Sequence, residues 1–360
     1  MRVSLRLVLV LVLLVAAGPT AVAGPVTATS DEPAWAEPMR ERLVAAERRL
    51  GGQIGVCVHH LGRDETFSWR GDEPWYLASG IKVPVAIAVL RQIEDGHLAL
   101  DAHVKLLADD YVDGAGPTNH QPVGAMLSIE WLVEQMLIHS DNTATDVLIR
   151  TVGLDEVNAV AHALLADRGL VITSLADVRR LVYGGLHLRA ANLGSQELLA
   201  LRRAPSGMRR VRRLAEILQA TPDEFLLPDL DSAYDAYYAQ HINASSLRNY
   251  GRMLAALNDG LALGPEATAW LIGVMTQVRT GERRIKAALP PGTRFAHKTG
   301  TQHRRWCDLG IASALVDGTR QQVVIAACAR GNASLAAGER ALRDVGAAVT
   351  ASGVLNLSNP

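Results

Sequence analysis

The strand patterns of this chain lie near its two ends and are separated by a long helical stretch. Short apolar and β-branched runs indicate two strands before residue 70 and three after residue 293. Asp317-Gly318 is a strong hairpin signal between the last two. The expected strands are 53–60, 65–69, 294–298, 307–316 and 321–330. Strands at both ends with helices between them predict an α+β fold, in which the sheet domain is discontinuous and a helical domain is inserted.

The length and the helical patterns give this fold its boundaries. The 360 residues suit one large domain or two intimate ones. Amphipathic patterns at 33–50 and 333–351 predict a helix at each end of the sheet domain. We expect the sheet domain at 33–88 and 262–352, and the helical domain at 89–261.

Charge and motif content exclude several classes of function. With 36 Lys and Arg against 37 Asp and Glu, the formal net charge is −1, and no nucleic-acid partner is expected. The eleven histidines show no zinc-ligand spacing, and neither Cys-x-x-Cys nor His-Glu-x-x-His occurs. The P-loop string and Gly-x-Ser-x-Gly do not occur either. We therefore expect no metal and no cofactor.

The first 23 residues have the three-part pattern of a secretory signal. Arg2 and Arg6 precede an apolar run, Leu7 to Ala17, which is too short to span a bilayer as a helix. The small residues Ala21-Val22-Ala23 follow. This pattern predicts cleavage near Ala23 and export to the periplasm or medium, with no membrane span left in the mature chain. We expect that chain to be a monomer. The alternatives are an uncleaved anchor or a buried helix.

The first motif with chemical potential is Ser79-Gly80-Ile81-Lys82, which opens a predicted helix. Residues three apart share one helix face, so the Lys82 amine lies one turn from the Ser79 hydroxyl. A serine becomes a good nucleophile when a neighbouring base takes its proton, and a lysine with a lowered pKa can be that base. The alternative is a capping serine beside a surface lysine.

Two further motifs have the same ambiguity. Ser140-Asp141-Asn142 puts a hydroxyl, a carboxylate and an amide between two predicted helices, where the same residue types are usual helix caps. Lys298-Thr299-Gly300-Thr301 ends a predicted strand. Its charge and hydroxyls suit a carboxylate, but it could also be a polar strand end with a turn glycine.

The three motifs in this order resemble the penicillin-recognising serine enzymes, and most closely their class A β-lactamase branch. The resemblance extends over residues 136–149, 280–290 and 294–311. It implies an antiparallel five-stranded sheet flanked by terminal helices, with an inserted all-helical domain. Ser79 would be the acylated nucleophile, Lys82 its proton partner, and Ser140 the residue that passes a proton to the leaving nitrogen.

The resemblance also assigns the binding residues. Asn142 would hold the side-chain amide of the substrate, and Lys298, Thr299, Gly300 and Thr301 would hold its carboxylate. The backbone N–H groups of Ser79 and Thr301 would form the oxyanion hole. The two lysines that face one pocket would depress each other's pKa, which suits a neutral Lys82 base.

The chain departs from the class A pattern at the group that frees the acyl-enzyme. The family string Glu-x-x-Leu-Asn is missing after the second motif, and residues 173–242 form an enlarged region there. Glu197 and Glu224 are the candidates for a deacylating base, although both also fit an amphipathic helix face. Without such a base the site could be acylated but would turn over slowly.

Three functions follow from these features. The first is a serine β-lactamase, which opens the cyclic amide of a β-lactam. The second is a D-alanyl-D-alanine peptidase or a slow-turnover penicillin-binding protein, whose partner is a peptidoglycan stem peptide. The third is a non-catalytic binder of wall fragments or β-lactams, against which the complete set of catalytic residues argues.

Two other features have open interpretations. A two-residue turn at Asp317-Gly318 pairs Val316 with Thr319, which places Cys307 opposite Cys328. These cysteines could form a disulfide in an exported protein, or could be free thiols that fill the core. Six arginines cluster in the enlarged region and form a solvated helix face or attract an anionic substrate or wall polymer: Arg202, Arg203, Arg209, Arg210, Arg212 and Arg213.

Overall fold

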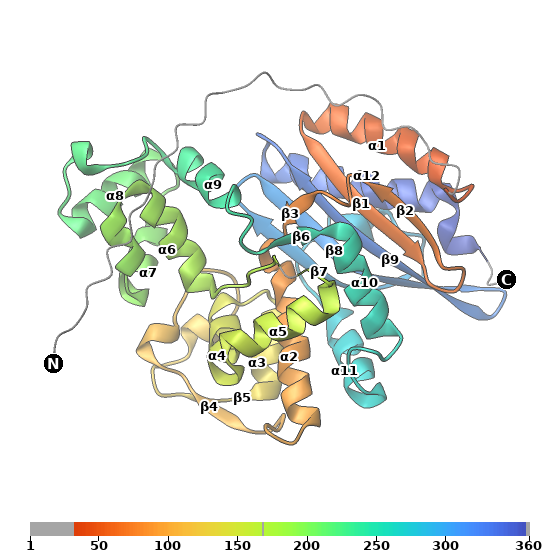
Figure 1. Ribbon diagram of the computed structural model, residues 1–360, viewed down its shortest axis with the longest axis horizontal. Coiled ribbons are helices and arrows are strands. Elements are labelled where there is room, and N and C mark those ends of the chain that lie inside the picture. Colours follow the sequence, from red (N-terminus) through yellow and green to blue (C-terminus); the bar gives the residue numbers. More distant parts are fainter. Residues whose placement is uncertain (1–31, 168, 358–360) are drawn as a thin grey trace. The chain divides into compact units, whose positions relative to one another are not determined.

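A five-stranded antiparallel sheet joins the two ends of the chain, which confirms the predicted fold class (Figure 1). Its order is β2-β1-β9-β8-β7, so two strands from the start of the chain pair with three from its end. The strands are β1 (Gln53–His60), β2 (Glu65–Trp69), β7 (Arg294–Gln302), β8 (Arg305–Val316) and β9 (Thr319–Arg330). The pairing of β1 with β9 is therefore the contact that closes the sheet across the helical middle of the chain.

This computed structural model describes residues 32–167 and 169–357. The predicted signal at residues 1–23 lies outside them. From Pro33 onward the chain forms one compact unit. Among the helices of the described ranges, none is both long enough and apolar enough to cross a membrane.

Helices cover both faces of the sheet. On one face α1 (Ala36–Leu50) and α12 (Leu335–Ser352) pack against each other and on the strands, and on the other face α10 (Leu247–Asn258) lies on β1 and β9. Side chains of a strand point alternately to its two faces, so the strands supply both cores. In β9, Val323 and Ile325 face α1 and α12, whereas Val324 and Ala326 face the core around α10.

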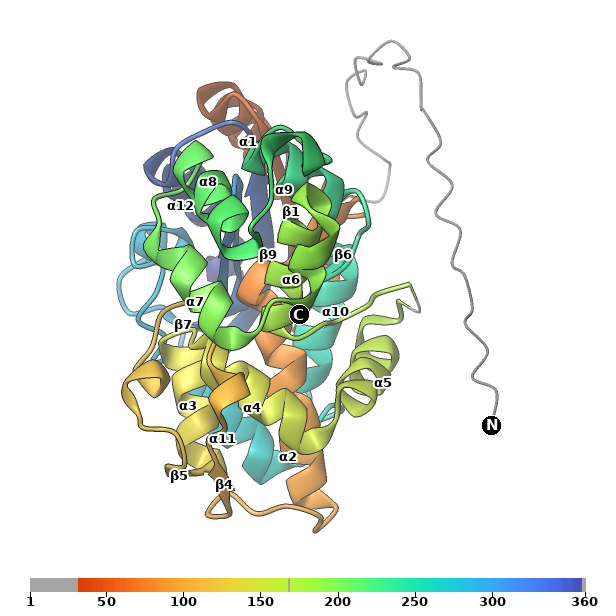
Figure 2. The ribbon, with the colours of Figure 1, turned by 90° about the vertical axis from the view of Figure 1, so that its left-hand side faces the viewer.

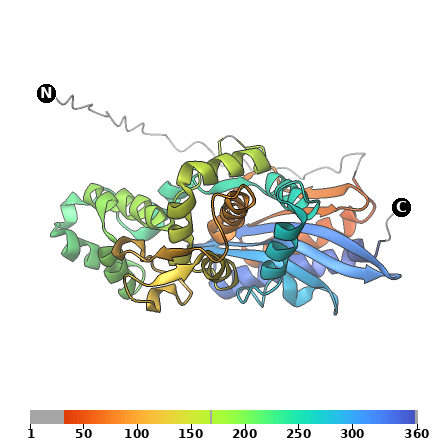
Figure 3. The same cartoon turned by 90° about the horizontal axis from the view of Figure 1, so that it is seen from below.

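The helices of the middle of the chain gather beyond one end of the sheet (Figures 1 and 3). Seen from that side, α6, α7 and α8 stand in front of the strands (Figure 2). The longer helices of this part are α2 (Lys82–Glu94), α3 (Ile129–Ile138), α4 (Asn142–Val152), α5 (Leu154–Leu165), α6 (Leu175–Leu186), α7 (Ser195–Arg203), α8 (Met208–Leu218) and α9 (Leu230–Tyr238), with α11 (Pro265–Met275) after α10. Short strand pairs β3–β6 (Pro74–Tyr76, Ala244–Ser246) and β4–β5 (His103–Lys105, Met126–Ser128) connect them.

The predicted hairpin register is confirmed. Val316 pairs with Thr319 around the Asp317-Gly318 turn, and Cys307 lies opposite Cys328. These two cysteines form a disulfide between neighbouring strands, whereas Cys57 is a buried free thiol. Of the two interpretations of the pair, the structure therefore has the cross-link.

We predict that replacing both Cys307 and Cys328 by serine lowers the free energy of unfolding by about 3 kcal/mol, because a link across 21 residues restricts the unfolded chain. Urea unfolding of the oxidised protein and of the double variant measures this difference. Peptide mapping without reductant should find one linked peptide pair and an alkylatable Cys57. Equal stabilities, or three alkylatable thiols, would rule the cross-link out.

Candidate active site

Ser79 lies in a short 3-10 helix, Ala78–Ile81, that leads directly into α2 at Lys82. This turn rests against strands β7 and β8. A Cβ atom at Gly80 would lie 2.6 Å from Leu309 Cδ1, so this turn approaches the side chains of β8 closely. The Tyr250 hydroxyl donates a 2.8 Å hydrogen bond to the Gly80 carbonyl oxygen and fixes the turn from the other side. The Ser79 backbone is therefore held firmly at the sheet.

The Lys82 amine is fully buried and donates to three acceptors from the second motif. Its Nζ lies 2.7 Å from the Ser140 carbonyl oxygen, 2.8 Å from Asn142 Oδ1 and 3.3 Å from Ser140 Oγ. Burial lowers the pKa of Lys82 to about 7, against which the negative charges of Asp141 and Asp146 act. An appreciable fraction of the amine is therefore neutral near pH 7 and can accept a proton, as the sequence analysis expected.

The second motif lies between α3 and α4, where one of its residues caps a helix and the other two line the pocket. Asp141 caps α4, with Oδ1 accepting from the Ala144 N–H at 3.0 Å and Oδ2 from the Thr118 N–H at 2.8 Å. Ser140 adopts a left-handed backbone with φ of 60°, and its carbonyl oxygen accepts from Lys82. The capping interpretation thus holds for Asp141, whereas Ser140 and Asn142 face the pocket.

The third motif lies on β7, where Thr299 and Thr301 line the same pocket whereas Lys298 and Gly300 do not. Lys298 is fully buried and its Nζ donates to the Thr299 carbonyl oxygen at 3.0 Å. Burial and then the charge of Lys82 lower the pKa of Lys298 well below its usual range. For Lys82 itself the main cause is burial rather than the second lysine, so the expected mutual effect acts chiefly on Lys298.

Two residues that the sequence analysis left without a role support this strand. The Thr280 and Thr299 hydroxyl oxygens are 2.5 Å apart. The buried Arg284 guanidinium donates to Thr301 Oγ1 at 2.6 Å and to the Gly300 carbonyl oxygen at 2.9 Å. A cation thus lies beside the threonines that the family resemblance assigns to a substrate carboxylate.

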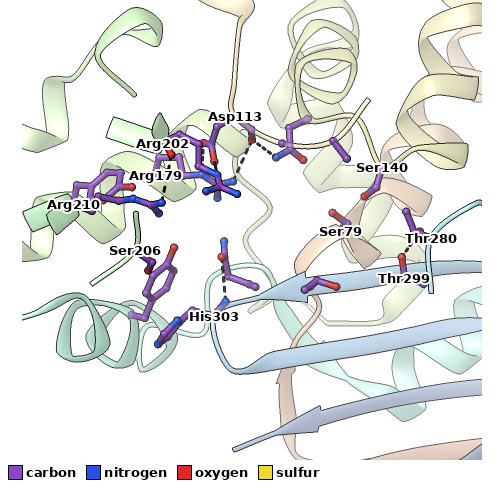
Figure 4. Close-up of a pocket in the computed structure, with 17 residues that line it drawn as sticks. Ser79, Asp113, Ser140, Arg179, Arg202, Ser206, Arg210, Thr280, Thr299 and His303 are labelled. Atoms are coloured by element: carbon purple, nitrogen blue, oxygen red, sulfur yellow. Dashed lines mark hydrogen bonds and ion pairs between the residues drawn. The ribbon is translucent and has the colours of Figure 1, made fainter. Parts of the chain in front are cut away.

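The pocket itself has a volume of about 480 Å³ and brings the three motifs together (Figure 4). Ser79, Ser140 and Thr299 lie at one end, and Asn142 and Thr301 line the same pocket. The catalytic and oxyanion roles of these residues remain predictions, but the geometry places them around one cavity. The other end is built from the enlarged region and carries several arginines (Figure 4).

Glu197 and Glu224 do not lie in the pocket, which corrects their assignment as deacylating bases. Glu197 Oε2 accepts from the Gly194 N–H at 2.8 Å and closes the first turn of α7. Glu224 Oε2 accepts from the Thr221 N–H at 2.7 Å in the same way. Both carboxylates are therefore used as helix caps on the surface. Among the described residues that line the pocket, Asp113 is the only one with a carboxylate.

Two acidic residues near the site were missed from the sequence. Asp113 accepts from Arg179 Nε at 2.7 Å, and its backbone carbonyl oxygen accepts from Asn142 Nδ2 at 2.7 Å. Asp146 is buried, and burial raises its pKa to about 7 although the N–H groups of Leu175 and Ala176 donate to it. Asp113 stands in a loop without a periodic pattern, and Asp146 sits within a helix as an ordinary polar residue would, so neither had a local signal.

We predict that Gly300→Ala lowers the free energy of unfolding by about 1–3 kcal/mol, because the added Cβ would lie 2.3 Å from the Leu77 carbonyl oxygen beside the nucleophile turn. Gly273→Ala is the matched control, because a Cβ there meets no atom within 4 Å. Urea unfolding of both variants measures the effect. If both substitutions change stability equally, β7 does not press against this turn.

Comparison of sequences identifies a family model that matches most of the chain and curated relatives that match shorter segments of it. The model of the β-lactamase enzyme family matches residues 38–352. A β-lactamase from Streptomyces albus G is 32% identical over 117 residues, which make up 31% of this chain and 37% of that enzyme. The matched segments thus span less than half the length of the curated β-lactamases that are 31–32% identical to this chain.

Solved structures show the same fold. A β-lactamase from Sphaerobacter thermophilus DSM 20745 superposes with a TM-score of 0.63 at 26% identity, over 89% of this chain and 98% of that one. PBP-A superposes with a TM-score of 0.63 at 19% identity, over 88% and 95% of the two chains. Together with the family model, which matches most of the described residues, these likenesses show that the chain belongs to the β-lactamase enzyme family.

Proposed function

We propose that the protein is a serine hydrolase that opens the amide of β-lactams through an acyl-enzyme on Ser79. The observation that carries the proposal is the position of the Lys82 amine, which is buried one turn from Ser79 and bound to Ser140 and Asn142. The family of the chain supports the same reaction class.

The chain contains every group that the proposed acylation step needs. Neutral Lys82 takes the hydroxyl proton of Ser79, and the Ser79 oxygen attacks the lactam carbonyl carbon. The backbone N–H groups of Ser79 and Thr301 stabilise the oxyanion. The C–N bond then breaks, and the proton passes from Lys82 through the Ser140 hydroxyl to the leaving nitrogen. Water completes the cycle by hydrolysing the Ser79 ester.

The substrate carboxylate fits the opposite wall of the pocket. Thr299 and Thr301 offer hydroxyls there, with Lys298 and Arg284 behind them. A bound anion favours the charged form of Lys298, whose pKa is otherwise lowered by burial. We further propose that the protein acts after export, on the basis of the signal pattern at residues 1–23.

A second candidate is a penicillin-binding protein or D-alanyl-D-alanine peptidase that is acylated quickly and deacylated slowly. It is favoured by one observation, which is that the pocket carboxylate of Asp113 is bound by arginines and the two predicted glutamates lie outside the pocket. Asp113 is bound by Arg179 and by Arg202, while Glu197 and Glu224 cap surface turns. A carboxylate bound in this way is a poor base for activating water.

We predict that fluorescent penicillin labels the protein covalently and that Ser79→Ala abolishes the label while the far-ultraviolet circular dichroism is unchanged. Intact-protein mass spectrometry locates the adduct. An adduct on the Ser79→Ala variant would refute the assignment of the nucleophile.

A chromogenic cephalosporin given to the same protein separates the two candidates. Turnover beyond one equivalent supports the hydrolase, whereas a single burst with a stable adduct supports the penicillin-binding protein. Glu197→Gln and Glu224→Gln should leave this turnover unchanged, because both side chains cap turns away from the pocket.

We predict that the acylation rate falls as pH drops below about 7, because Lys82 is then protonated and cannot accept the Ser79 proton. Lys82→Arg keeps the charge but cannot act as the base, and should slow acylation by roughly 10²–10⁴-fold. The exposed Lys286→Arg is the matched control and should react as the wild type does. Stopped-flow acylation across pH 5–9 measures both effects, and a flat profile with an active Lys82→Arg variant would exclude Lys82 as the base.

A further inference from the structure

The pocket that begins at Ser79 continues into a group of arginines supplied by the enlarged region (Figure 4). Arg179 comes from α6, Arg202 from α7 and Arg210 from α8. We call these three residues the arginine cluster. Figure 4 shows them near Asp113, at the end of the pocket away from Ser79 and Thr299.

The arginine cluster has more positive charge than its protein partners neutralise. The Asp113 carboxylate forms ion pairs with two of its members. Arg179 Nε lies 2.7 Å from Oδ1, and Arg202 Nε lies 3.4 Å from Oδ2. Arg210 instead donates to the Ala204 carbonyl oxygen, at 2.8 Å from Nη2. Within the described ranges no carboxylate lies at ion-pair distance from Arg210. Two guanidinium groups thus share one carboxylate, and the third has only backbone carbonyl oxygens as acceptors.

Two of these arginines are held in fixed positions rather than extended into solvent. The Arg179 side chain is 12% exposed and Arg210 is 8% exposed. Uncompensated charge at such depth is unfavourable unless an anion joins it. Guanidinium groups fixed in advance bind a carboxylate with little loss of side-chain entropy.

The position of the cluster indicates which part of a substrate would reach it. Asn142, which is expected to hold the substrate's side-chain amide, donates from Nδ2 to the Asp113 carbonyl oxygen at 2.7 Å. The arginine cluster lies beyond this link. The part of the acyl side chain that extends from the amide away from Ser79 therefore runs along the pocket toward the cluster. The stacked rings of Tyr234 and His303, with centroids 4.8 Å apart, also line this path.

We propose that the arginine cluster is a subsite for a carboxylate at the far end of the substrate's acyl side chain. This inference rests on the proposed function, because it assumes that the acyl group is bound next to Ser79. Of the six clustered arginines in the sequence, Arg202 and Arg210 line the pocket, whereas Arg203 and Arg209 are exposed neighbours that do not. The chain thus offers an exposed neighbouring arginine as a control for Arg202 and another for Arg210.

Binding to the Ser79→Ala variant tests the subsite without acylation. The two probes are a penicillin with a glutaryl side chain and the same penicillin with its terminal carboxylate replaced by a carboxamide. Calorimetry should show the carboxylate probe binding about tenfold more tightly at low salt, because charge-assisted hydrogen bonds to guanidinium are strong. Equal affinities for the two probes would overturn the proposal.

Substitution of single arginines then locates the preference. In the Ser79→Ala background, Arg202→Gln and Arg210→Gln should each remove most of it and leave the affinity for the carboxamide probe within about twofold. Arg203→Gln and Arg209→Gln remove the same net charge and should keep the preference. If the controls weaken binding equally, or if the Arg202→Gln, Arg210→Gln double variant keeps the preference, the proposal is wrong. Because Arg202 is exposed, its variant remains informative if Arg210→Gln does not fold.

The protein with Ser79 intact distinguishes this failure from failure of the proposed function. Acylation by the carboxamide probe tests the function without the anionic group. A protein that neither probe acylates, but whose Ser79→Ala variant prefers the carboxylate in an Arg202- and Arg210-dependent manner, would retain the subsite and lose the proposed function. Acylation by both probes, without any preference for the carboxylate, would retain the proposed function and rule out the subsite.

Discussion

The buried amine of Lys82 is the point at which the two parts of the chain depend on each other. An amine removed from water must find acceptors, and here they come from Ser140 and Asn142 at the junction of α3 and α4. The start of α2 is fixed against the sheet by Gly80 and Tyr250. The sheet therefore positions the amine, and the inserted helices supply the groups that make its burial possible. Neither part could form this site alone.

The enlarged region is coupled to the same junction. Asp146 of α4 accepts the first two N–H groups of α6, and Arg179 of α6 binds Asp113, whose carbonyl oxygen holds Asn142. A carboxylate at the start of a helix is favoured by the helix dipole, which offsets part of the cost of burying Asp146. The stretch where the family resemblance predicts a catalytic glutamate is thus occupied by a helix that supports the Asn142 amide through Asp113.

Local patterns in the sequence predicted those features that local geometry decides. The spacing of Ser79 and Lys82 predicted that the two residues share a helix face. The Asp317-Gly318 turn predicted the strand register, which places Cys307 opposite Cys328. Glu197 was misjudged, because its carboxylate accepts from the Gly194 N–H three residues earlier and is used at the start of α7. Arg179 and Asp113 are 66 residues apart, and their contact arises only when α6 packs beside the pocket. The packing of α7 and α8 likewise decides which of the six clustered arginines face the pocket.

The left-handed backbone of Ser140 sets a limit on what this site can become. That conformation costs a residue with a side chain about 1–2 kcal/mol, and glycine would adopt it freely. Selection for stability alone would therefore favour glycine, whereas the proton delivery proposed for Ser140 needs the hydroxyl. A serine at this position therefore lowers the stability of the fold in exchange for the reactivity of its hydroxyl. Drift toward glycine at this position would leave a sturdier protein that still folds around its pocket but has lost its chemistry.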